Sequence, residues 1–127
     1  MSAVLDASAL LAFLQGEPGA ALVEAELVDG SVCGALAWAE VAQRVVARGR
    51  DWELVRALFG TYRLSVVPLG PEDADWAARR WRPGDGLSLS DLLPLALAGR
   101  LGAPLVTAES AREAAAQVTA IRCGPGE

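Results

Sequence analysis

Short apolar segments alternate along this chain with longer segments of helical pattern, and this alternation constrains the fold more than any other feature. The expected strands, of four to six residues each, are residues 2–6, 31–34, 64–69, 103–107 and 118–123. The expected helices are residues 9–15, 19–28, 36–48, 54–62, 71–81, 91–100 and 110–117. Strands this apolar, joined by helices, predict an α/β protein with a parallel sheet covered on both faces.

The residues at the expected helix ends agree with this pattern. Ser8 and Ser90 are expected N-caps, because a hydroxyl oxygen can accept a hydrogen bond from an N–H group of the first helical turn. Pro71 suits the first position of its helix. The acidic residues 72–75 are interpreted as a solvated helix start, where carboxylates favour the helix dipole.

The composition excludes several kinds of chemistry. The 127 residues include no histidine, and all eleven basic residues are arginine. A Ser-His-Asp or Cys-His mechanism, imidazole-bound zinc, a lysine Schiff base and a P-loop lysine are therefore excluded. The net charge of -5 argues against broad electrostatic attachment to nucleic acid, so such a substrate needs bound cations and local arginines.

Length and apolar content predict one domain in the cytoplasm. The chain is long enough for one core, expected over residues 1–123, with residues 124–127 as a flexible tail. Cys33 and Cys123 lie far apart in apolar segments, which is typical of buried thiols in a reducing compartment. Because every apolar stretch is too short to span a bilayer, we expect no membrane association.

Four carboxylates fall where expected strands and helices meet: Asp6, Glu40, Asp91 and Glu109. In open parallel sheets the ligand crevice lies beyond the carboxyl ends of the strands, where the strand order reverses. If the first and fourth strands are neighbours, three of these acids share that crevice, and Glu40 joins them from the helix after the second strand. Such an oxygen cage would suit Mg²⁺ or Mn²⁺.

Each acid also has an ordinary structural explanation. Asp6 can cap the following helix, and Asp91 can act with Ser90 at a helix start. Glu40 can form a salt bridge with Arg44 one turn on. Glu109 can be a surface acid that opens a helix. Only the joint placement of the four acids therefore indicates a site.

Three segments of the chain resemble the PIN-domain ribonucleases, and within them the VapC-type toxins of toxin-antitoxin pairs. They are residues 4–11 (VLDASALL), residues 86–98 (GLSLSD followed by LALA) and residues 104–109 (PLVTAE). The resemblance covers nearly the whole length and implies an α/β/α sandwich around a parallel sheet of four or five strands. It also implies metal-dependent cleavage of RNA.

The same resemblance assigns roles to individual residues. Asp6, Glu40 and Asp91 match the metal-binding acids of the family, and Glu109 falls at its fourth acidic position. Ser8 and Thr107 match hydroxyl positions beside the site. This chain departs from the family at the fourth acid. That position is usually aspartate, often with another acid nearby, whereas here it is Glu109, followed by Arg112. The site could therefore bind either one or two metal ions.

The implied function is that of an endoribonuclease toxin that hydrolyses phosphodiester bonds with water activated by Mg²⁺ or Mn²⁺. The expected substrate is tRNA or mRNA, with phosphate contacts from Arg44, Arg48 and Arg112. Family members usually form homodimers and are silenced by a small VapB-like antitoxin whose C-terminal segment lies over the site.

Two other functional hypotheses are compatible with the sequence. One is a catalytically weak or inert PIN-like domain that acts through metal or partner binding, which Glu109 and Pro94 favour. The other is a phosphoacceptor or phosphatase with Asp6 as the nucleophile. Such sites generally need a lysine, or an aspartate two residues on where this chain has Ser8.

Overall fold

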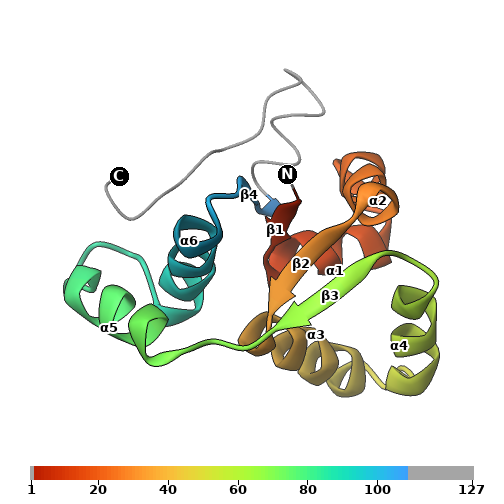
Figure 1. Cartoon of the computed structure of the whole chain (residues 1–127). Coiled ribbons are helices and arrows are strands. Elements are labelled where there is room, and N and C mark those ends of the chain that lie inside the picture. The colour runs from red at the N-terminus through yellow and green to blue at the C-terminus, as the bar shows by residue number, and fades with distance from the viewer. Residues whose placement is uncertain (1, 109–127) are drawn as a thin grey trace.

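The computed structural model describes residues 2–108, and in them strands and helices alternate as the sequence predicts (Figure 1). The strands are β1 (Ala3–Leu5), β2 (Ser31–Gly34), β3 (Leu64–Val67) and β4 (Leu105–Val106). The helices are α1 (Ala7–Gln15), α2 (Ala20–Asp29), α3 (Ala35–Ala47), α4 (Trp52–Gly60), α5 (Pro71–Arg80) and α6 (Leu89–Leu101). The helix expected at 110–117 and the strand expected at 118–123 lie outside the described residues.

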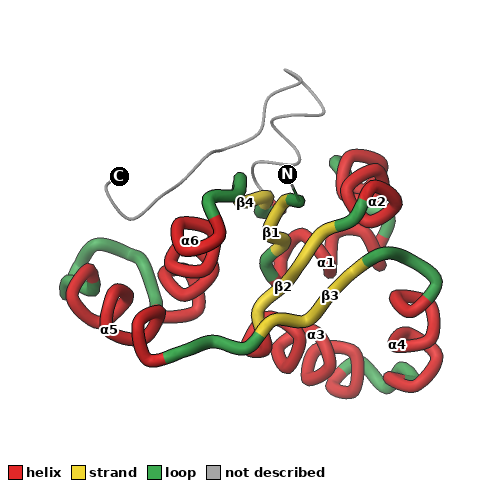
Figure 2. The backbone as a smooth tube through the Cα atoms, in the orientation of Figure 1, coloured by secondary structure: helices red, strands yellow, loops and turns green. Residues whose placement is uncertain are grey.

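The four strands form one parallel sheet in the order β3-β2-β1-β4 (Figure 2). Val4 of β1 pairs with Val32 of β2 on one side and with Leu105 of β4 on the other. The predicted parallel α/β fold is therefore confirmed, and so is the expectation that the first and fourth strands are neighbours.

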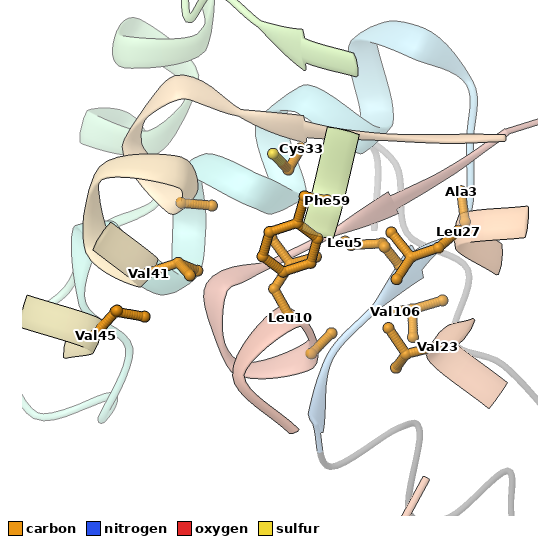
Figure 3. Packing of buried hydrophobic residues seen from close by; sticks show 12 residues of the cluster. Ala3, Leu5, Leu10, Val23, Leu27, Cys33, Val41, Val45, Phe59 and Val106 are labelled. Atoms are coloured by element: carbon orange, nitrogen blue, oxygen red, sulfur yellow. The ribbon is translucent and has the colours of Figure 1, made fainter. Parts of the chain in front are cut away.

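Two hydrophobic clusters on opposite faces of the sheet give the domain its layers. Because strand side chains alternate between faces, Ala3 and Leu5 of β1 point into one cluster and Val4 into the other. Helices α1 to α4 supply the larger cluster, which contains Leu10, Val41 and Phe59, among other residues (Figure 3). Helix α6 covers the opposite face, and α5 packs beside α6 (Figure 1).

Two predicted N-caps are wrong, because α1 and α6 each begin two residues earlier than expected. Asp6, not Ser8, caps α1, since its Oδ1 accepts a hydrogen bond from the Ala9 N–H at 2.9 Å. Ser88, not Ser90, caps α6, since it forms a reciprocal capping box with Asp91 three residues on. The carboxylates of Asp6 and Asp91 therefore hold helix starts as well as lying near the strand ends.

The interpretation of residues 72–75 as a solvated helix start is wrong for Asp73, which is only 1% exposed. Its two carboxylate oxygens accept hydrogen bonds from Arg100 Nε at 2.9 Å and Nη2 at 3.0 Å. Oδ2 also accepts from the Gly70 N–H, and Arg100 donates to the Pro68 carbonyl. This network joins α5, α6 and the connection after β3.

The cysteine and tryptophan residues of the described part are largely structural. Cys33 is buried in the core, and this burial raises the pKa of its thiol to about 12. Trp38 packs edge-on against Trp52 at 5.0 Å between ring centroids, and both rings pack against the larger hydrophobic cluster. Trp81 differs, because it is 46% exposed. Cys123 lies outside the described residues, and within them no helix is long and apolar enough to cross a membrane.

Candidate active site

The topology creates a crevice at the carboxyl edge of the sheet, between β1 and β4. The chain leaves β1 toward β2 and β3 on one side, whereas β4 lies on the other side, so the strand order reverses at this point. Asp6 follows β1 directly, and its N–H donates to the carbonyl of Val106 in β4 at 3.3 Å. Its carboxylate therefore lies at the mouth of the crevice.

Ser8 links the two strands that flank this crevice. Its Oγ donates to Asp6 Oδ1 at 2.7 Å and accepts from the Ala108 N–H at 2.9 Å. The hydroxyl thus holds the Asp6 carboxylate and the start of the segment after β4 in a fixed relation. Thr107, the other hydroxyl residue expected at the site, is half-buried directly after β4 but does not line the cleft that Ser8 lines.

Glu40 approaches from α3, which begins immediately after β2 with Gly34 as its N-cap. The side chain is half-buried on the helix turn that faces the crevice. The salt bridge to Arg44, which was the alternative explanation for this acid, does not form between these two described residues. Glu40 therefore keeps its carboxylate available in the cleft, with Arg44 one turn farther along the same helix.

Asp91 approaches from the third position of α6 and is exposed. Its Oδ2 accepts hydrogen bonds from the Ser88 N–H at 2.9 Å and from the Ser88 hydroxyl at 3.0 Å. Asp91 thus interacts with a serine at a helix start, as the sequence suggested, but the serine is Ser88 and not Ser90. It does not remove Asp91 from the crevice, because the residue also lines the cleft.

Together these elements enclose a cleft of about 360 Å³, which we call the acidic cleft. It is lined by Asp6, Ala7, Ser8, Leu11, Gln15, Glu17, Glu40, Gln43, Arg44, Ser90, Asp91 and Ala108. Three of the four carboxylates expected from the sequence, and Arg44, are therefore brought together. Glu109 and Arg112 lie outside the described residues.

The electrostatics of the cleft centre on Asp6. Burial raises the pKa of this carboxyl above its usual value, and the negative charges of Asp91 and Glu40 add to the effect. The hydrogen bonds from Ser8 and Ala9 act in the opposite direction but do not cancel it. A carboxyl group whose pKa is raised by burial and by neighbouring acids in a crevice is a physical sign of a functional site.

The donor set of the acidic cleft fits a hard divalent cation, because it consists of carboxylate, hydroxyl and amide oxygens without imidazole or thiolate. Among residues 2–108, however, no three acidic or cysteine side chains converge closely enough, as they stand, to hold one ion. A cation bound by Asp6, Glu40 and Asp91 therefore requires their side chains to move toward one another.

Glu17 is a further acid of the cleft that was not predicted from the sequence. It follows Gly16, which ends α1 in the left-handed conformation at φ 64°, and its N–H donates back to the carbonyl of Ala12 at 3.0 Å. This turn brings Glu17 back beside the helix. Gly16 at the helix end indicates such a turn in the sequence. The sequence does not indicate that the turn would bring Glu17 to the cleft.

Comparison with known proteins agrees with this architecture. Residues 3–117 match the model of a family described as the PIN domain. A structure titled as a toxin-antitoxin complex from Klebsiella pneumoniae superimposes with a TM-score of 0.68 over 84% of this chain and 85% of that chain, at 20% sequence identity. No curated protein matches the chain. At this identity the structural likeness shows a shared fold.

Proposed function

Because this chain belongs to the PIN domain family, whose members are generally nucleases that use divalent metal ions, we propose that it is a metal-dependent endoribonuclease. The observation that carries the proposal is the meeting of Asp6, Glu40 and Asp91 in one cleft at the point where the strand order reverses. A chain without histidine or lysine has few other groups for hydrolysing a phosphodiester bond.

The proposed metal ligands are Asp6, Glu40 and Asp91, with Glu109 as the fourth acid of the site. A bound Mg²⁺ or Mn²⁺ supplies a water of lowered pKa and neutralises charge on the phosphate. Ser8 orients the Asp6 carboxylate through its 2.7 Å hydrogen bond. Loss of the proton from Asp6, which burial and neighbouring acids disfavour, becomes easier when a cation shares the cleft.

The remaining side chains of the cleft would position the substrate. Arg44 stands at the edge of the acids on α3 and makes no salt bridge with Glu40, so its guanidinium can contact a phosphate of the RNA. Ser90 and Gln43 can donate hydrogen bonds to the same backbone. Arg112 would add a phosphate contact near Glu109.

The biological role we propose is that of a toxin in a type II toxin-antitoxin system. The structural neighbour titled as a toxin-antitoxin complex supports this role through the fold alone. In this proposal the substrate is tRNA or mRNA, the protein acts in the cytoplasm as a homodimer, and a VapB-like antitoxin silences it. Exposed apolar side chains such as Val46 and Leu58 provide surface for these protein contacts.

A second candidate is a PIN domain with weak or no catalysis that acts through metal or partner binding. Two observations favour it. The acids of the described residues do not converge on one point, and the fourth position of the expected set is Glu109. An activity assay separates the two candidates.

The test is cleavage of a broad pool of structured RNA by the purified protein in EDTA, Mg²⁺ or Mn²⁺. The proposal predicts cleavage that needs the metal and is lost in Asp6→Asn and in Asp91→Asn. Asparagine can cap α1 in place of Asp6, and at position 91 its amide oxygen can still accept from the Ser88 N–H, so both variants should fold. Asp75→Asn, an exposed acid on α5, is the matched control and should cleave normally. Equal cleavage by all variants, or none by the wild type, would favour the second candidate.

A further inference from the structure

A second pocket adjoins the acidic cleft and differs from it in charge. Its volume is about 510 Å³. It is lined by Leu11, Leu14, Gln15, Arg44, Val45, Arg48, Arg50, Asp51, Leu54 and Val55, and we call it the arginine pocket. Leu11, Gln15 and Arg44 line both spaces, so one opens beside the other. Its lining residues come from α1, from the end of α3 and the turn after it, and from the start of α4.

Helix geometry sets the order of charges along this path. Glu40, Arg44 and Arg48 are spaced four residues apart, so they follow one face of α3 at intervals of about 6 Å. The first faces the acidic cleft, the second lines both spaces, and the third lines only the arginine pocket. An extended ligand that runs from the acidic cleft along α3 therefore meets guanidinium groups at successive helical turns.

The turn after α3 adds a third guanidinium. Gly49 adopts the left-handed conformation at φ 72°, and the Arg50 N–H donates to the carbonyl of Val45 at 3.0 Å. This reversal places Arg50 beside Arg48 at the pocket. A side chain at position 49 would strain that conformation, so the glycine helps to place the cation.

The charges of this pocket are available to a ligand. In the described part of the chain, no carboxylate lies within ion-pair distance of Arg44, Arg48 or Arg50, whereas Arg56 and Arg100 both have acidic partners. Asp51 is the one acid of the lining, and its Oδ1 caps α4 by accepting from the Glu53 N–H at 2.9 Å. Arg48 also lies against the uncharged side-chain amide of Gln15, which can accept a hydrogen bond from its guanidinium. Three arginines facing one acid give the pocket a positive character in a chain of net charge -5.

The floor of the pocket is aliphatic. Leu14, Leu54 and Val55 contribute to it, and Leu54 is 70% exposed. A ligand that combines a flat apolar face with an anionic group at its edge matches an aliphatic floor bounded by guanidinium groups. A nucleotide of single-stranded RNA has this combination, with the base as the apolar face and the phosphate as the anion.

We propose that the arginine pocket binds the nucleotide next to the cleaved bond, with its base on the aliphatic floor and its phosphate on Arg48 and Arg50. This inference rests on the proposed ribonuclease function and deepens it, because it states how single-stranded RNA leaves the acidic cleft. Arg44, at the junction, contacts the phosphate between the two spaces.

The test is binding of a short labelled single-stranded RNA of random sequence to the full chain in EDTA, followed by fluorescence anisotropy at several salt concentrations. Arg48→Gln and Arg50→Gln should each weaken binding, and the double variant should bind about tenfold more weakly. The slope of log affinity against log salt should become shallower by about 0.7 for each arginine removed. Leu54→Asn should weaken binding without changing that slope.

Arg56→Gln is the matched control, because Arg56 is an exposed arginine of α4 that pairs with Glu53 and does not line the pocket. If the pocket variants match this control in affinity and slope, the proposal is overturned. Unchanged RNA binding together with loss of binding to a protein partner would likewise overturn it and assign the pocket to a peptide.

The same variants distinguish this proposal from the ribonuclease function itself. RNA binding that depends on Arg48 and Arg50 in a protein that cleaves no RNA would support the pocket and contradict the nuclease function. Metal-dependent cleavage with RNA binding that is insensitive to both arginines would support the nuclease function and contradict the pocket.

Discussion

Asp73 and Asp91 occupy the same local position in two helices, yet their surroundings differ completely. Each is the third residue of its helix and accepts a hydrogen bond at 2.9 Å from the backbone N–H of its N-cap residue. Asp73 is buried and paired with Arg100, whereas Asp91 is exposed and shares a cleft with Asp6 and Glu40. The contrast shows that the side chain contributed by another element determines whether such an acid is structural or available for function.

The two regions also differ in the direction of their pKa shifts. Burial alone would raise the pKa of Asp73, but the hydrogen bonds and charge of Arg100, with the Gly70 N–H, hold it below its usual value. Burial raises the pKa of Asp6, and the neighbouring acids raise it further. A carboxylate stabilised by its own arginine needs no cation, whereas a group of acids in a shared cleft gains from one.

The largest expected effect is on catalysis in the acidic cleft. Asp91→Asn should reduce RNA cleavage by roughly 10²-fold or more, because it removes one of the proposed metal ligands and its charge. Its thermal unfolding should stay close to that of the wild type, since asparagine can still take part in the capping interactions. Rates of cleavage at saturating metal, normalised to folded protein, give the measurement, and a variant with wild-type rates would contradict the assignment.

The corresponding change in the other region should act on stability. Asp73→Asn should lower the free energy of unfolding by about 2–4 kcal/mol, because it leaves the partly buried Arg100 without its carboxylate. Urea unfolding measures the loss, with Asp75→Asn on the same helix as an exposed control. RNA cleavage per folded molecule should be unchanged. Undiminished stability in the Asp73 variant would show that the buried pair is dispensable.

The Asp73 pair should also make stability depend on acid pH. The unfolded carboxyl titrates near its ordinary value of 3.8 and the folded one at a lower pKa, so the unfolded chain binds the proton more readily in between. The stabilisation is therefore present above pH 3.8 and is lost as the pH falls through the folded pKa. Chemical denaturation at decreasing pH should show a steeper loss in the wild type than in Asp73→Asn, and parallel curves would contradict this prediction.

The smallest expected effect has the opposite sign. In EDTA at neutral pH, Asp6→Asn should raise the free energy of unfolding by roughly 0.5 kcal/mol, because it removes a half-buried charge beside two other acids while asparagine still caps α1. The raised pKa agrees with this sign, since the stability contributed by Asp6 is lost as the pH rises through its folded pKa. A destabilised Asp6 variant under these conditions would show that Asp6 serves the fold more than the cleft.

Much of the fold could be predicted from the sequence, because it depends on local patterns. The strand bounds 31–34 agree with β2, and the start at Pro71 agrees with α5. For one of the two wrong N-caps, that of α6, the sequence contains a pattern that indicates the correct residue. Ser88 has Asp91 three residues on, the spacing of a capping box, whereas Ser90 has Leu93 at that spacing.

The features that could not be predicted depend on contacts between distant segments. Asp73 meets Arg100 across 27 residues, and no local pattern distinguishes it from its exposed neighbours. Glu17 joins the acidic cleft only because the turn at Gly16 folds it back beside α1. For Asp6, Glu40 and Asp91 the sequence contained more information, because parallel strands bring their carboxyl ends to one edge. The roles proposed for Glu109 and Arg112 remain predictions, since both lie outside the described residues.

We expect the acidic cleft, and not the buried acid of α5, to hold a divalent cation. The most direct test is thermal unfolding of the wild type, Asp91→Asn and Asp73→Asn, each in EDTA and in excess Mn²⁺, since a ligand that binds only the folded state raises the melting temperature. We predict that Mn²⁺ stabilises the wild type and the less stable Asp73 variant by similar amounts and stabilises the Asp91 variant much less. An equal Mn²⁺ effect in Asp91→Asn and the wild type would contradict it.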